Sequence, residues 1–298
     1  MSNLPVSDLS ALTSLSSALN AIVVQAAGAV VSVHSHRSRA TGFVWKPGLV
    51  VTAEEALADE GEITLVFADG STRPATIAGR DHTTDVALLR FEAADLPGTL
   101  TPAGLKNAVP PLASLAVVVA TDDGAPTAAL AMVSKSAGAW RSLRGGEISA
   151  RIELGTRLRR SQEGGLVLSA DGRAIGMAVL GPRRTLVIPA ATIEHVAGRL
   201  ETHGRIARGY LGVGLQPVKL DDGIGAMVMS IDKNGPAAAA GLRQGDVLTA
   251  LNNQSFSSMR ALMRELGPDS VGAVVDVAGL RGGEPVRFAL TIGERPAA

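Results

Sequence analysis

The 298-residue chain contains no cysteine, which excludes disulfide bonds, thiolate nucleophiles and thiolate-bound metals. Aromatic residues make up only 3% of the chain although 46% of it is hydrophobic, so the core must be built from Ala, Val, Leu and Ile. Net charge is absent too, since 28 Lys and Arg balance 28 Asp and Glu. Composition therefore gives no electrostatic argument for nucleic acid or an anionic membrane as a partner.

Basic residues are missing from the N-terminal region, where the first is Arg37. A secretory signal needs a basic start before its apolar run, so we expect a cytoplasmic protein, or a periplasmic or membrane-associated one if an upstream leader is missing. The apolar run at 21–33 is shorter than the roughly 20 residues of a membrane span, and we expect no span. Apolar residues at three- and four-residue spacings instead predict a helix over 10–27 that covers one edge of the core.

Glycine and proline, at 34 and 15 residues, are plentiful between the short apolar segments that follow. From 29 to 188 these segments predict a series of β-strands, and Asp69-Gly70 is a strong hairpin signal. Many short strands at this spacing indicate closed β-barrels. A helix is predicted at 190–202, directly after Pro189.

From 209 the pattern changes to a compact unit of short strands with a helix at 257–266. We expect Ser257 to cap this helix and Gly267-Pro268 to end it. The sequence thus predicts a mainly β protein in four parts. They are an N-terminal helical segment (1–28), a barrel domain (29–203), a linker (204–208) and a C-terminal domain (209–298).

Four groups of residues in the barrel domain carry a family pattern. They are Thr41-Gly42-Phe43-Val44 with Gly48-Leu49-Val50-Val51-Thr52, Gly79-Arg80-Asp81 with Thr84-Asp85-Val86-Ala87-Leu88-Leu89, Gly164-Gly165 with Asp171-Gly172-Arg173-Ala174-Ile175-Gly176, and Val187-Ile188-Pro189. Together they resemble the HtrA/Deg family of serine proteases. The resemblance covers about 19–292 and implies a trypsin-like double β-barrel followed by a PDZ domain, a β-sandwich with helices.

Two of the three catalytic positions depart from the family pattern. The family's Thr-Asn-x-His is here Thr52-Ala53-Glu54-Glu55, which places Glu55 at the general base. The family's Gly-Asn-Ser-Gly-Gly is Ser161-Gln162-Glu163-Gly164-Gly165, which places Glu163 at the nucleophile and leaves only Asp85 unchanged. Glutamate is a weak base, and its attack on a peptide carbonyl gives a labile anhydride.

The sequence therefore predicts a pseudoprotease with no intact catalytic triad. The alternative, which the family resemblance alone suggests, is an active HtrA-type serine endopeptidase in protein quality control. Glu55, Asp85 and Glu163 converge if the fold is kept, so that one of them takes up a proton or all share Mg²⁺, Ca²⁺ or Mn²⁺. The other interpretation is that both glutamates point into solvent. We expect no resident metal or other cofactor.

The C-terminal unit carries two further stretches, Arg208-Gly209-Tyr210-Leu211-Gly212-Val213 and Gly241-Leu242-Arg243-Gln244-Gly245-Asp246-Val247-Leu248. Both resemble the PDZ domain of bacterial proteases. That resemblance implies that the backbone of Tyr210, Leu211, Gly212 and Val213 receives a peptide's terminal carboxylate, and that the following strand pairs with the peptide.

The PDZ resemblance also implies a pocket for an apolar last residue. We expect Met259, Leu262 or Met263 of the predicted helix to line it, although the same residues also suit the core face of the helix. The expected partners are protein C-terminal tails or unfolded segments. The family resemblance also allows a homotrimer or a hetero-oligomer with an active homologue.

Overall fold

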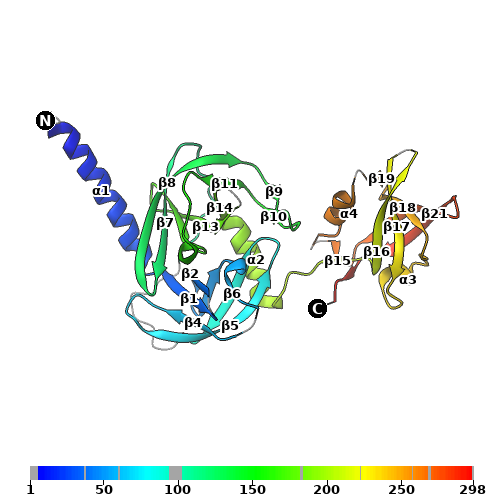
Figure 1. Cartoon of the computed structure of the whole chain (residues 1–298), viewed down its shortest axis with the longest axis horizontal. Helices are drawn as coiled ribbons and strands as arrows, with labels where there is room; N and C mark the ends of the chain where they lie inside the picture. The colour runs from blue at the N-terminus through cyan, green and yellow to red at the C-terminus, as the bar shows by residue number, and fades with distance from the viewer. Residues whose placement is uncertain are drawn as a thin grey trace. The chain divides into compact units, whose positions relative to one another are not determined.

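A computed structural model describes residues 6–36, 38–59, 61–93, 103–181, 184–221, 223–256, 258–267 and 270–296. The chain divides into two compact units, Met1–Arg205 and Ile206–Ala298 (Figure 1). Each unit is described by itself.

The first unit contains two closed antiparallel barrels of six strands each. The first barrel follows the order β1 (Val30–Ser35), β2 (Ser38–Lys46), β3 (Leu49–Thr52), β6 (Val86–Phe91), β5 (Thr72–Asp81) and β4 (Ile63–Val66). The second follows β11 (Arg151–Leu154), β14 (Thr185–Pro189), β13 (Ala174–Leu180), β12 (Leu166–Ser169), β7 (Leu115–Asp122) and β8 (Ala125–Ala137). The double barrel predicted from the sequence is confirmed.

Aliphatic side chains fill both barrels, as the shortage of aromatic residues requires. The interior of the second is a cluster of Ala, Val, Leu and Ile that includes Val118, Ile152 and Ile175. Closure leaves no free sheet edge around either barrel. Helix α2 (Ala190–His203) then runs against the barrels and ends at Gly204, which adopts the left-handed conformation of a C-cap.

Two short 3₁₀ turns and one hairpin lie where the barrels face each other. Turn η1 (Glu54–Ala56) follows β3, and turn η2 (Arg160–Gln162) precedes β12. Strands β9 (Trp140–Arg141) and β10 (Glu147–Ile148) form a separate hairpin. The barrels are joined directly, since the Thr41 hydroxyl in β2 donates to the Ser161 carbonyl in η2 at 2.8 Å. This junction holds the candidate catalytic positions.

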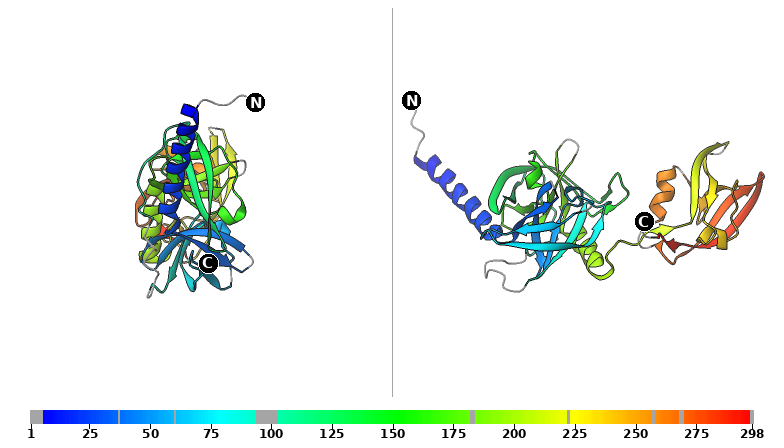
Figure 2. Two further views of the ribbon diagram at one scale, coloured as in Figure 1. Left: turned by 90° about the vertical axis from the view of Figure 1, so that its left-hand side faces the viewer. Right: turned by 60° about the horizontal axis from the view of Figure 1, so that its bottom comes forward.

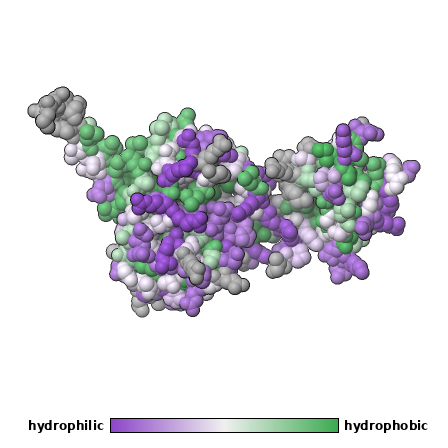
Figure 3. Space-filling view, viewed as in Figure 1, coloured by the Kyte–Doolittle hydropathy of each residue, from purple (hydrophilic) through white to green (hydrophobic). Residues whose placement is uncertain are grey.

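Helix α1 (Val6–Ala27) differs from its prediction. The expected helix forms, but it does not cover the core, because most of its described side chains are exposed, including Leu12 and Val24 at 60% and 66%. Figure 2 shows α1 extending past the barrels, and Figure 3 shows apolar residues along its surface.

The second unit is a sheet with helices beside it. Its strand order is β16 (Val213–Leu220), β17 (Gly223–Ile231), β18 (Val247–Leu251), β20 (Val274–Arg281) and β21 (Glu284–Thr291), and β19 (Gln254–Ser255) pairs with β18. The smaller elements are β15 (Gly209–Tyr210), β22 (Gly293–Glu294), α3 (Pro236–Ala239) and α4 (Met259–Glu265). This is the predicted PDZ fold.

Helix α4 begins later than predicted. Its N-cap is Ser258, whose hydroxyl accepts from the Ala261 N–H at 3.2 Å. The predicted cap Ser257 and the predicted stop at Pro268 lie outside the described residues.

Candidate functional site

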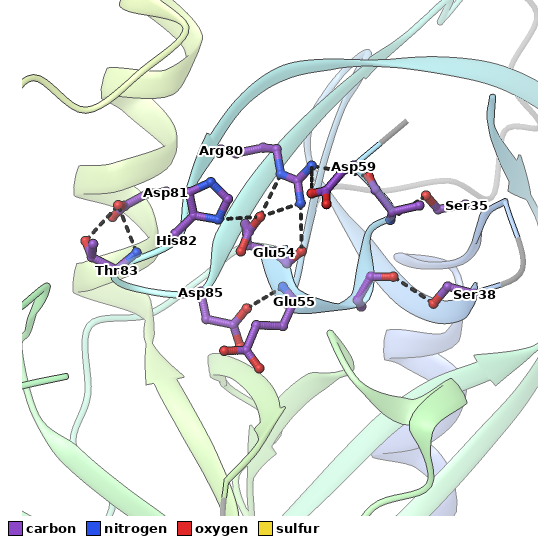
Figure 4. A network of polar contacts seen from close by, with 12 residues as sticks. Ser35, Ser38, Glu54, Glu55, Asp59, Arg80, Asp81, His82, Thr83 and Asp85 are labelled. Atoms are coloured by element: carbon purple, nitrogen blue, oxygen red, sulfur yellow. Dashed lines mark hydrogen bonds and ion pairs between the residues drawn. The ribbon is translucent and has the colours of Figure 1, made fainter. Parts of the chain in front are cut away.

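Two of the three catalytic positions adjoin directly. The backbone N–H of Glu55 in η1 donates to Asp85 Oδ1 at 2.8 Å (Figure 4). The turn before Asp85 is held by Asp81, whose carboxylate accepts from the hydroxyls of Thr83 and Thr84, both at 2.7 Å. Asp85 itself is forced to a positive φ of 58°. The aspartate thus bonds to a backbone amide at the place where the family pattern has an imidazole.

The Glu55 side chain turns to a basic partner instead of to Asp85. Its Oε1 forms an ion pair with Arg144 Nη1 at 3.0 Å, and 47% of the side chain is exposed. Arg144 comes from the turn between β9 and β10, and it also donates to the His82 carbonyl at 3.2 Å. The same turn is fastened by Ser142, whose hydroxyl donates to the Thr83 carbonyl at 2.6 Å.

Glu163, by contrast, is only 4% exposed. Its Oε1 accepts from the backbone N–H of Leu180 at 3.3 Å. The interpretation in which both glutamates point into solvent is therefore wrong for Glu163, because the structure buries that carboxyl group beside β13.

Burial and nearby like charges raise the pKa of two carboxyl groups in this cleft. Desolvation raises the pKa of Asp85 to about 7; the Glu55 N–H opposes the rise, and the charges of Glu55, Glu163 and Glu54 add to it. Burial likewise raises the pKa of Glu163, against the hydrogen bond from Leu180. Of the two ways to relieve carboxylate repulsion, proton uptake is the one these positions favour. Within the described residues, no group of three His, Cys, Asp or Glu is placed to hold a metal ion.

The turn before Glu163 uses its amide hydrogens internally. The N–H of Glu163 donates to the Arg160 carbonyl at 3.1 Å, and that of Gln162 donates to the Arg159 carbonyl at 3.0 Å. In trypsin-like proteases the N–H of the nucleophile helps to bind the oxyanion. Here that N–H is already bonded, and the Arg160 carbonyl oxygen occupies its acceptor position.

A buried ion-pair network beside the cleft was not anticipated from the sequence. Glu54 is 2% exposed, and its Oε1 accepts from Arg80 Nε at 2.7 Å, from Arg80 Nη2 and from His82 Nδ1 at 2.8 Å (Figure 4). Its signals were the first glutamate of Thr52-Ala53-Glu54-Glu55 and the arginine of Gly79-Arg80-Asp81. His82 thus pairs with Glu54 and not with Asp85.

The predicted carboxylate-binding loop lies at the start of β16. Gly212 has a φ of 76°, and an added Cβ would lie 3.1 Å from Gly235 Cα. The carbonyls of Leu211 and Gly212 accept from Ala237 and Asp232, both at 2.8 Å. The N–H groups of Leu211 and Gly212 donate to no carbonyl in the described part of the chain. The loop is therefore fixed through its carbonyls while these N–H groups remain available to an anion.

The strand after this loop is an edge strand, since β16 pairs only with β17 in the described sheet. Of the predicted pocket residues, Met259 is half-buried against the core. Leu262 has no exposed surface and packs inside the core, so it does not line an open pocket in this structure. The side chain of Met263 lies outside the described residues.

Comparison with known proteins agrees with both folds. The family model described as a trypsin-like peptidase domain matches residues 40–177, and that of the PDZ domain matches residues 209–292. A probable periplasmic serine endoprotease DegP-like of Halomonas elongata is 28% identical over 287 residues, 90% of this chain and 59% of that protein. The Chlamydia muridarum protein of the same name is 28% identical and covers 87% of this chain and 54% of its own length. The chain thus spans less than two thirds of the curated relatives it matches.

Solved structures show the same fold. A serine endoprotease from Yersinia pestis superposes with a TM-score of 0.71 at 24% identity, covering 93% of this chain and 98% of that chain. The HtrA-type protease AlgW with decapeptide gives the same TM-score and coverage at 21% identity. At these identities the likeness concerns the fold.

The expectation of a cytoplasmic protein is wrong. The relatives are named periplasmic, and α1 fits a signal sequence or an anchor because Ser10–Ala27 is long, apolar and almost entirely unburied. The prediction was wrong because it relied on the absence of basic residues before Arg37 and on the expectation that the helix packs on the barrels. Signal sequences also have this length and composition, so the helix does not by itself indicate a membrane span.

Proposed function

The chain belongs to the HtrA family, and we propose that it is a pseudoprotease of that family which binds the C-terminal tails or unfolded segments of other proteins. The observation that carries the proposal is the pair of glutamates, Glu55 and Glu163, at the positions of general base and nucleophile. Relatives are named serine endoproteases, so active proteolysis is the second candidate.

Three contacts support catalytic silence. Asp85 accepts from a backbone N–H and has no imidazole to orient. Glu55 is engaged in an ion pair with Arg144. The N–H of Glu163 donates to the Arg160 carbonyl, so it is unavailable to an oxyanion. Each removes a different element of the serine-protease mechanism: orientation of the base, proton abstraction and charge stabilisation.

Binding is supported by a different part of the chain. The available N–H groups of Leu211 and Gly212 and the unpaired edge of β16 form a strand-addition site with an anion-binding end. Tyr210, Val213 and Met259 flank it as the proposed ligand contacts. Leu262 supports the pocket from the core, and Met263 is kept as a proposed contact from its position in α4.

The cellular compartment is proposed from the names of the relatives, which are called periplasmic. We place the chain in the periplasm, with α1 as signal or anchor. Fractionation of cells expressing the full chain and a variant lacking residues 1–27 tests this, since only the full chain should leave the cytoplasm. Assembly as a homotrimer or a hetero-oligomer with an active homologue remains a prediction for sedimentation analysis.

The deciding experiment measures cleavage of casein and a fluorogenic peptide by the full chain, by Glu163→Ser and by Glu55→His with Glu163→Ser. We expect no turnover and no fluorophosphonate labelling by the native chain. We also expect none by the double variant, because both side-chain changes leave the Glu163 N–H bonded to Arg160. Labelling of the native chain would instead show that it is an active serine protease. Turnover by the double variant alone would agree with a catalytically silent native chain. It would also show that the N–H of residue 163 can be released from the Arg160 carbonyl.

A further inference from the structure

A second groove lies on the PDZ unit, between helix α3 and the outward face of β21. It encloses about 630 Å³. Its lining includes the short side chains of Pro236, Ala239, Ala240 and Ala289 with Gly235 and Gly293, and Tyr210 and Pro296 line it as well. We name it the α3–β21 groove. Short side chains on both walls let another backbone approach closely.

The groove adjoins the carboxylate-binding loop and shares Tyr210 with it, but the rest of its lining is different. Leu211, Gly212, Val213 and Met259 do not line it. The side chain of Leu211 lies in the core and is 4% exposed. The two sites therefore border each other at Tyr210, while the groove has its own walls in α3 and β21.

The floor of the groove is closely fitted. An added Cβ at Gly293 would lie 2.7 Å from the Pro236 side chain, so only glycine allows β22 to lie against α3. Strand β21 is the second edge of the described sheet, paired with β20 alone. Its backbone offers unpaired N–H and C=O groups beside a groove, the two features that receive an added strand.

Acidic groups give the groove its charge. Asp232 and Glu294 both line it and are exposed. The Asp232 carboxylate is fixed in place, accepting from the Tyr210 hydroxyl at 3.2 Å and from the Asn234 N–H at 3.0 Å. No Lys or Arg is among the described residues that line the groove. A carboxyl-terminal ligand would be repelled here, whereas a basic side chain would be attracted.

We propose that the α3–β21 groove is a second peptide site, which takes an extended segment bearing basic side chains and needs no free carboxylate. The segment adds to the edge of β21, packs small or branched side chains on Pro236 and Ala239, and directs a Lys or Arg toward Asp232 and Glu294. The PDZ unit then holds two different peptide chemistries at the opposite edges of one sheet.

The test uses the full chain and a fluorescein-labelled octapeptide of alternating Val and Lys with an amidated C-terminus. We expect saturable binding by anisotropy, weakened at least ~10-fold by Ala239→Trp, which fills the groove from an exposed position. Ala125→Trp makes the same change at an exposed residue of β8 and should leave binding unaltered. Circular dichroism checks that both variants fold.

Charge and site identity are tested in parallel. Asp232→Asn with Glu294→Gln should weaken binding several-fold and reduce its salt dependence, and a Val and Glu octapeptide should not bind. An unlabelled apolar peptide with a free carboxylate should not displace the probe. Displacement by that peptide, unchanged binding to Ala239→Trp, or no saturable binding up to millimolar protein would each overturn the proposal, and none of them bears on catalytic silence.

Discussion

The barrel cleft and the PDZ loop both keep their frameworks, but in the function proposed above only the loop keeps the groups that it needs. The cleft depends on side chains, so replacement at Glu55 and Glu163 removes base and nucleophile while both barrels stay closed. The loop depends on backbone N–H groups, which most substitutions leave unchanged. On this proposal, a site made of main-chain donors persists where a site made of side chains is lost.

The charged residues left in the cleft then have a structural role. Glu54, Arg80 and Asp85 are buried or half-buried in the junction, where Glu54 pairs with Arg80 and His82 and Asp85 accepts from a backbone N–H. We therefore expect substitutions of these residues to alter the stability of the fold and its pH dependence. Substitutions in the PDZ loop should instead alter the affinity for peptides.

The largest effect is expected from Arg80→Met. It leaves the 3%-exposed Glu54 carboxylate without its main cation, and breaking such a buried pair costs about 3–5 kcal/mol. Denaturant unfolding of the full chain should show the loss. The control is Arg173→Met, which removes an exposed pair with Asp171 and should cost less than about 1 kcal/mol. Equal effects in the two variants would contradict a structural role for the buried network.

Asp85→Asn comes next, and its effect depends on pH. The folded chain raises the pKa of Asp85 to about 7, so it holds this proton more tightly than the unfolded chain does. Native stability should therefore fall as pH rises from about 4 to 7. The asparagine variant should lose most of that dependence and gain on the order of 2–4 kcal/mol at pH 8, with little change at pH 4. Glu163 contributes in the same direction and should account for the remaining slope.

Thermal unfolding at pH 4 and pH 8 measures this difference. Asparagine still offers Oδ1 to the Glu55 N–H, so the main contact of the native residue is retained. A variant that is less stable at pH 8 would show that the Asp85 carboxylate is needed in its charged form, as it is in a working catalytic site.

Gly212→Ala should reduce affinity for a free-carboxylate peptide by ~10-fold or more. The added Cβ is strained at a φ of 76° and crowds Gly235, which shifts the N–H groups that face the carboxylate. Gly241→Ala is a matched control, because its φ is 80° and its Cβ would meet nothing within 4 Å. Similar affinity losses in both variants would assign the effect to strain in the domain and not to the loop.

The sequence correctly predicted the helices and strands that are determined by neighbouring residues. The helix predicted at 190–202 is α2, ended by a left-handed glycine, and the paired turn signals gave the strands of both barrels. It failed where the outcome depends on a distant neighbour. Glu54 in η1 is buried against Arg80, which comes from β5, and most of α1 is exposed because little of the described chain packs on it.

For the candidate sites, too, some residues could be predicted from the sequence and others could not. Alignment of motifs located Glu55, Asp85 and Glu163 and the glycine of the PDZ loop. It could not tell which apolar residue of α4 faces the core, and the structure assigns that place to Leu262. The bond from the Glu163 N–H to the Arg160 carbonyl has no sequence signal, because it depends on the orientation of one peptide plane.

The smallest effect is expected from Arg144→Gln, which removes the cation over Glu55. Both side chains of the pair are about half exposed, so the cost to stability should stay under about 1 kcal/mol. Arg141→Gln, which removes an exposed pair with Glu147 on the same hairpin, is the control. Proteolysis should remain absent in both variants, since freeing Glu55 supplies neither a nucleophile nor the bonded N–H of Glu163. Casein cleavage by Arg144→Gln would mean that the hairpin inhibits a competent site, and the contrast between a lost side-chain site and a kept backbone site would no longer hold.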